Sequence, residues 1–283
     1  MGQVKYVPLA LTALVSAAAL ALAAWFSTAA VTVVVCILSA VVAAGWPQLM
    51  GLTARRSLSA VIFGAGVVAA VGSAIVTQVE SLFFWSALAL AFGVMLVFFI
   101  QVLRGAGRPN RLESTLGACA GVVVTTTAAG WVAGLRYPAG MEGGLDGGGI
   151  AQLRVRGFFA FEDGDILGAT GPGGELSVVS LAAFALIAGA LVACLPVREA
   201  VVLPGIIVAS VAAAVGTALL WGELTLLFAA VLGLAAGALL ASFRRFLVLQ
   251  GVPEALFSKL AVGASPIAAM GGLVYFTERL LFV

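Results

Sequence analysis

Long stretches without a charged residue dominate the hydrophobic pattern of this chain. A helix of about 20 apolar residues crosses the hydrocarbon core of a bilayer. Barrel strands would alternate in polarity, whereas these stretches are apolar on every face. The pattern therefore predicts an all-α, polytopic integral membrane helical bundle of about nine transmembrane helices. The expected spans are residues 7–25, 29–47, 58–77, 82–103, 115–135, 177–195, 201–221, 224–243 and 260–277.

The overall composition leads to the same class of protein. Of the 283 residues, 63% are hydrophobic and only 9% are charged, whereas charged residues make up about 25% of a soluble domain. So few charges cannot cover a water-facing surface, which excludes soluble and disordered classes. Only Lys5 and Lys259 among the 14 basic residues are lysines, and together with the alanine, glycine and valine content this indicates a high-GC bacterial source.

The basic residues are sorted between the two sides of the predicted bundle. Ten fall in one set of connecting segments: Lys5, Arg55, Arg56, Arg104, Arg108, Arg111, Arg198, Arg244, Arg245 and Lys259. Four fall in the other set: Arg136, Arg154, Arg156 and Arg279. Because cytoplasmic loops carry the excess of lysine and arginine, we expect the first side to be cytoplasmic. The prediction is a bacterial cytoplasmic (inner) membrane protein with its N-terminus inside and its C-terminus outside.

The first span, within residues 1–27, has two interpretations. Lys5, the apolar run and the small residues around Ala23 are also typical of a secretory signal peptide. The run is long, however, and Trp25 and Phe26 are unusual after a cleavage site. We therefore expect an uncleaved first helix, which acts as a signal anchor.

The second half of the chain repeats the first. Shifted by 144 positions without gaps, residues 62–116 align with residues 206–260 with 22 identities in 55 positions. The matches continue through a polar loop, where Gly107, Pro109 and Ser114 each recur 144 residues later. A single register across three helices and a loop predicts a duplication rather than a shared apolar composition.

The duplication divides the chain into one helix and two units of four. Repeat 1 covers residues 28–135 and repeat 2 covers residues 177–283. Because each unit holds an even number of spans, the two units have the same orientation and are related by an axis along the membrane normal. We describe this arrangement as 1+4+4.

A glycine-rich segment, residues 136–176, joins the two repeats on the extracytoplasmic side. Alternating polarity from Gln152 to Arg156 and an acidic turn at 162–165 suggest a short β-hairpin. The segment is either a lid over a path between the halves or a linker that the duplication requires.

Chemistry inside the membrane is sparse. No ionisable residue falls near the middle of a predicted span and the chain has no histidine, which argues against a carboxylate-driven pump. The candidate substrate-path residues are Thr125, Thr126 and Thr127 in the fifth span, with Ser265 in the ninth. Alternatively, the threonine hydroxyls bond back to the backbone of their own helix.

Two pairs of arginines could bind anionic lipid head groups on the cytoplasmic side. Arg55 and Arg56 precede the third span, and Arg244 and Arg245 follow the eighth. The bias of basic residues toward the cytoplasm predicts the same arginines without any specific lipid site.

No catalytic motif, metal-ligand cluster or cofactor fingerprint is present in the sequence, and the three cysteines form no CxxC pair. We therefore expect no enzyme activity, no catalytic residue, no metal and no cofactor. The duplication favours a small permease-like transporter or channel with a path between the repeats. The alternative is a non-catalytic membrane subunit or assembly scaffold that binds lipid or a partner protein. Expected partners are the lipid bilayer and a membrane protein partner or a second copy of the chain, with no nucleic acid.

Overall fold

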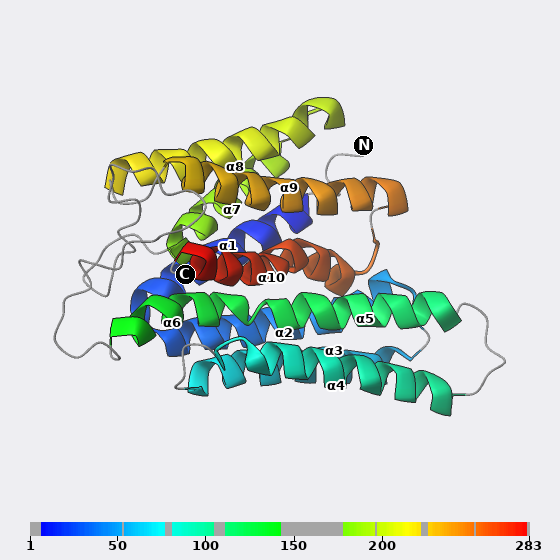
Figure 1. The fold of residues 1–283 in the computed structure, drawn as a ribbon. Coiled ribbons are helices and arrows are strands. Elements are labelled where there is room, and N and C mark those ends of the chain that lie inside the picture. Colours follow the sequence, from blue (N-terminus) through cyan, green and yellow to red (C-terminus); the bar gives the residue numbers. More distant parts are fainter. Residues whose placement is uncertain are drawn as a thin grey trace.

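A computed structural model describes residues 7–52, 54–76, 81–104, 111–142, 178–195, 197–221, 226–251 and 253–281, and in this part of the chain it is helical throughout, without strands (Figure 1). The helices are α1 (Val7–Phe26), α2 (Thr28–Leu49), α3 (Arg55–Ile75), α4 (Phe84–Leu103), α5 (Arg111–Thr127), α6 (Gly130–Glu142), α7 (Val178–Ala193), α8 (Glu199–Trp221), α9 (Leu226–Gln250) and α10 (Leu256–Leu281). The predicted helical membrane bundle is confirmed.

Each of the nine predicted spans coincides with a helical segment. Helices α5 and α6 follow each other within one span and are counted together. On this count, eight segments of the described chain are long and apolar enough to cross a membrane. The ninth, α7, has 16 described residues and the same apolar character. Consecutive spans run in opposite directions (Figure 1).

Local sequence signals explain how the helices end. Ser27 alone separates α1 from α2, and its extended backbone lets the Oγ accept a hydrogen bond of 3.1 Å from the Ala30 N–H, as N-cap residues do. Gly51 after α2 and Gly251 after α9 have φ values of 62° and 85°. Glycine is favoured at both positions because this left-handed region is costly for residues with a Cβ.

The two most buried spans lie at the centre of the bundle. In the α5–α6 span and in α10, 72% of the apolar membrane-spanning stretch is buried inside the protein. The same share is 28% for α4 and 22% for α8. Helix α10 packs against α1, α2, α5 and α6, whereas α7, α8 and α9 pack mainly on one another. The last helix therefore lies against the first half of the chain rather than among the helices that precede it in sequence.

Helix α1 is part of this packed core. It contacts α7, α10 and α2, and its Ala17 and Leu20 side chains have no exposed surface. A Cβ on Gly263 of α10 would overlap the backbone carbonyl of Leu9, so the two helices meet backbone to backbone. In the described chain, α1 thus fills the space between α7 and α10.

Charged residues gather at the two ends of the helices. The described residues at one end include eight of the basic side chains that the sequence assigns to the cytoplasm: Arg55, Arg56, Arg104, Arg111, Arg198, Arg244, Arg245 and Lys259. The opposite end holds Arg136 and Arg279. The alternation of the helices therefore places the basic residues as the sequence predicts.

Two features of the fold differ from the sequence expectation. The fifth span is interrupted at Ala128 and Ala129, between α5 and α6. Helix α6 then continues to Glu142, beyond the expected start of the segment joining the repeats at residue 136. The suggested β-hairpin in that segment lies outside the described residues.

Candidate functional site

The interruption between α5 and α6 is the main irregularity in the described spans. At the interruption, three backbone N–H groups donate to the carbonyl of the residue three positions earlier, rather than four as in an α-helix. The Ala129 N–H donates to Thr126 (3.3 Å), that of Trp131 to Ala128 (3.2 Å) and that of Val132 to Ala129 (3.0 Å). These tight turns replace α-helical bonds over a short stretch. A bilayer tolerates such irregular backbone only where protein or a cavity surrounds it.

The three candidate threonines stand directly before the interruption, and their hydroxyls bond to backbone carbonyls. Thr126 and Thr127 bond within α5, to Val122 at 2.8 Å and to Val123 at 2.9 Å. Thr125 also reaches across to the Ile62 carbonyl of α3 at 3.0 Å. Each hydroxyl is therefore satisfied without a ligand in this conformation.

Helix α10 crosses the chain at this interruption. A Cβ on Gly130 would overlap the Gly271 carbonyl, and a Cβ on Gly271 would lie 2.8 Å from the Thr127 oxygen and 3.0 Å from that of Ala128. The backbones are in direct contact, a closeness that glycine permits at helix crossings. No room for a substrate remains between them in this arrangement.

Two large aromatic side chains close the crossing on either side. The Trp131 indole N–H donates to the Ile267 carbonyl of α10 at 2.8 Å. The Tyr275 ring stacks on Phe83 with a centroid distance of 4.9 Å. Both Trp131 and Tyr275 are fully buried, so that each helix is anchored against its neighbours beside the glycine contact.

The fourth candidate, Ser265, lies on α10 before the crossing. It is fully buried and its hydroxyl donates to the Ala261 carbonyl at 2.6 Å. The structure therefore brings the threonines and α10 together but leaves Ser265 bonded within its own helix.

Ser39 of α2 is a further polar residue beside the candidate threonines, and no sequence motif marks it. Its buried hydroxyl on α2 has no hydrogen-bond partner among the described residues. A Cβ on Gly66 of α3 would lie close to the Ser39 hydroxyl and 2.9 Å from the Thr125 Cβ. Ser39 and Thr125 thus flank one glycine at the junction of α2, α3 and α5. A lone serine in the middle of an apolar span is the signal that could have found it.

At the basic end, Arg244 ties three helices together. Its guanidinium pairs with the Glu199 carboxylate at the start of α8, with Nη2 to Oε1 at 2.8 Å and Nε to Oε2 at 3.1 Å. Its Nη1 donates to the Ala193 carbonyl at the end of α7. Arg244 is buried, and this two-point geometry is the strong form of an arginine–carboxylate pair.

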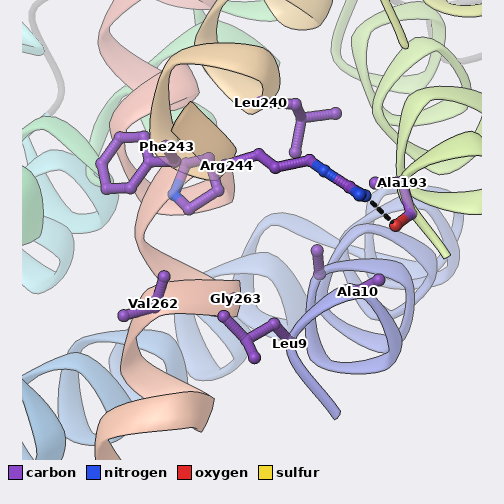
Figure 2. Close-up of a pocket in the computed structure, with 10 residues that line it drawn as sticks. Leu9, Ala10, Ala193, Leu240, Phe243, Arg244, Val262 and Gly263 are labelled. Atoms are coloured by element: carbon purple, nitrogen blue, oxygen red, sulfur yellow. Dashed lines mark hydrogen bonds between the residues drawn. The ribbon is translucent and has the colours of Figure 1, made fainter. Parts of the chain in front are cut away.

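Beside Arg244 lies a small recess of about 50 Å³ between α1, α9 and α10 (Figure 2). Its walls are apolar apart from Arg244, and they include Leu9, Ala10, Phe243, Val262 and Gly263. Arg244 extends past the recess toward Ala193 (Figure 2). The recess is open, and it lies near the basic end of these helices.

The other candidate arginines lie apart from this recess. Arg55 and Arg56 are exposed at the start of α3, and Arg245 is exposed on α9. The structure therefore does not gather the four arginines into one site. It draws Arg244 into an ion pair within the protein and leaves the others at the bundle end.

The fold defines a polytopic helical membrane protein. In the described part of the chain no cluster of histidine, cysteine, aspartate or glutamate could hold a metal ion. Comparisons with protein-family models, curated proteins and solved structures find no match to this chain.

Proposed function

We propose that the protein is a small permease-like transporter or channel whose path runs between the two repeats, at the crossing of the α5–α6 span with α10. The observation that carries the proposal is the interrupted helix within one of the two most buried spans. Interrupted helices at the interface of two repeats commonly form substrate sites in transporters. The three candidate threonines stand at this interruption.

The helix bounds support the duplication on which the proposal rests. Helices α3 and α8 begin at Arg55 and Glu199, and helices α2 and α7 end at Leu49 and Ala193. Both pairs of positions are 144 residues apart, the register found in the sequence. A duplicated unit would produce this agreement between helix boundaries.

Contacts at the crossing also fit a symmetry axis between the repeats. The carbonyl of Thr127 faces Gly271, its counterpart 144 residues later. Trp131 and Tyr275 are counterparts in the same register, and both are fully buried. Equivalent residues meet where an axis passes between two related helices.

A path at the crossing would open by separating α6 from α10. This movement breaks the bond from Trp131 to Ile267 and releases the carbonyls of Thr127 and Ala128, which can then face a substrate. The short stretch of tight turns before Gly130 is the natural hinge, because its backbone is already outside regular α-helical bonding. In the described part of the chain the acidic residues lie near helix ends, so substrate recognition falls to hydroxyls and carbonyls.

Cysteine accessibility tests the proposed path. After replacement of Cys36, Cys119 and Cys194, single cysteines are placed at Thr125, Thr126 and Thr127 and exposed in membrane vesicles to a charged thiol reagent. We expect labelling at one or more of these positions, since a path must admit water to the crossing. Val123→Cys is the matched control, because Val123 is on the same helix and its side chain is exposed on the outer surface of the bundle. Absence of labelling at all three positions would contradict the proposal.

The second candidate function is a non-catalytic membrane subunit or scaffold that binds lipid or a partner protein. The direct backbone contact between Gly130 and Gly271 favours it, because a rigid crossing suits a structural component. Mild detergent extraction distinguishes the two candidates. A scaffold co-purifies with a partner at fixed stoichiometry, whereas recovery of the chain alone or as a homo-oligomer counts against a heteromeric role.

A further inference from the structure

We propose that the recess between α1, α9 and α10 binds a phospholipid with an anionic head group. The upper part of an acyl chain enters the apolar recess, and the phosphate lies beside Lys259. This inference does not depend on the transport proposal, because it concerns a surface at the basic end of the bundle rather than the central crossing.

The depth of the recess matches the region where acyl chains meet lipid head groups. Leu9, Ala10 and Ala13 lie in the first two turns of α1, and Val262 and Pro266 lie in the first half of α10. From Lys259 to Pro266, α10 rises by about 10 Å. The recess therefore begins just inside the membrane surface and extends toward the hydrocarbon core.

Small residues leave the recess open. Ala10, Ala13 and Gly263 contribute walls with little side-chain volume, while Leu240 and Phe243 of α9 form the opposite wall. Leu9 and Ala10 of α1 lie beside Val262 and Gly263 of α10 on one side of the recess (Figure 2), where the two helices are in contact. Apolar walls of this kind favour a hydrocarbon chain over a polar ligand.

Basic side chains at the same end of α9 and α10 as the recess favour a phosphate. Lys259 lies on the same face of α10 as Val262, Gly263 and Pro266, at helical spacings of three, four and seven residues. Its side chain leans toward the start of α10, which is the basic end. The pair of Arg244 with Glu199 is neutral overall. Lys259 and the exposed Arg245 outnumber the exposed Glu254 that precedes α10, so this end of α9 and α10 keeps a net positive charge.

Lipid binding to the purified full-length chain tests this proposal. Native mass spectrometry measures binding of phosphatidylglycerol, phosphatidylcholine and, separately, inorganic phosphate. We expect phosphatidylglycerol to bind more tightly than phosphatidylcholine. Lys259→Gln should weaken phosphatidylglycerol binding about fivefold, the effect of one basic residue at a membrane surface. Ala10→Leu should weaken binding of both lipids about tenfold, because its added carbons fill the recess.

Arg104→Gln is the control, since Arg104 is exposed at the same end of the bundle but follows α4; its phosphatidylglycerol binding should match that of the wild type. Ala10 is buried, so its variant is first checked for an unchanged unfolding temperature without lipid. Lys259 is only half-buried. If Ala10→Leu does not fold, the phosphatidylglycerol affinity of Lys259→Gln alone tests the proposal. Wild-type affinity for phosphatidylglycerol in Lys259→Gln would overturn the proposal. Binding of inorganic phosphate as tight as that of phosphatidylglycerol would also overturn it, because that ion has no chain for the recess.

Discussion

Among the described residues, polar side chains mostly bond to backbone carbonyls. The Trp46 N–H donates to Gly117 of α5 at 2.8 Å, and the Trp131 N–H donates to Ile267 of α10 at the same distance. A hydrogen bond between membrane helices contributes about 0.6 kcal/mol on average. Such bonds fix the rotation of each helix against its neighbour, which uniform apolar packing would leave undefined.

The pair of Arg244 with Glu199 is a residue-scale feature that can be tested directly. Glu199→Gln removes the carboxylate and leaves a buried guanidinium with less compensation. The side chain of Glu199 is 38% exposed, which reduces the effect because water screens the pair. We expect the free energy of unfolding to fall by about 1–2 kcal/mol, measured by denaturant unfolding in detergent micelles.

Glu113→Gln provides the matched control for this variant. Glu113 also lies in the first turn of its helix at the same end of the bundle, but it is exposed. Both substitutions remove the same favourable interaction with the helix dipole, so their difference reports the ion pair alone. Equal destabilisation by the two variants would show that the pair contributes nothing measurable.

At the scale of the helices, glycine decides where two spans can touch. Gly130 and Gly271 bring the α6 and α10 backbones together, whereas Gly64 of α3 and Gly216 of α8 have open space where a Cβ would point. Many glycines occur in the apolar stretches, and the sequence does not distinguish these two roles. Only the packing of neighbouring helices separates a required glycine from a replaceable one.

Substitution of these glycines by alanine should therefore give opposite results. Gly271→Ala places a Cβ 2.6 Å from the Trp131 ring and 2.8 Å from the Thr127 oxygen, and such overpacking costs about 1–3 kcal/mol. Gly130→Ala should destabilise at least as much, because its Cβ meets backbone atoms. Unfolding temperature by intrinsic tryptophan fluorescence measures both variants.

Gly64→Ala and Gly216→Ala are the controls for the crossing. Their new methyl groups meet no neighbour in the structure, and alanine is favoured over glycine in a helix by up to about 1 kcal/mol. We expect unchanged or slightly raised unfolding temperatures. If all four variants behaved alike, the close contact at the crossing would have no energetic role.

At the scale of the whole molecule, the spans differ in how much of their surface is buried by other helices. The α5–α6 span and α10 occupy the centre, and α4 and α8 are the least buried. Apolar character alone does not predict this arrangement, because lipid-facing and protein-facing residues are equally hydrophobic. The charges, in contrast, are sorted by helix end, and alternation of the spans is enough to place them.

The orientation of the molecule is a testable prediction at this scale. The excess of basic residues predicts that the end with Arg55 and Arg244 faces the cytoplasm. Alkaline phosphatase, which is active only outside the cytoplasm, should be active when fused after residue 283 and inactive when fused after residue 252. The reversed pattern of activities would show that the basic end faces outward.

The sequence by itself determined the class of protein, the number and approximate positions of the spans and the end at which each described charge lies. These properties follow from local runs of apolar residues and from chain alternation, and neither needs knowledge of packing. The sequence allows two interpretations of Thr125, Thr126 and Thr127, either as residues that line a substrate path or as residues whose hydroxyls bond to the helix backbone. In the structure the three hydroxyls bond to backbone carbonyls.

The tertiary structure alone decided the interruption after Thr127, the contact of Gly130 with Gly271, the bonding of Arg244 and the recess beside it. Each depends on which helices become neighbours, and in a lipid environment the hydrophobic pattern carries little information about that choice. Backbone contact and buried polar bonds select the neighbours, and they appear only once the helices are assembled.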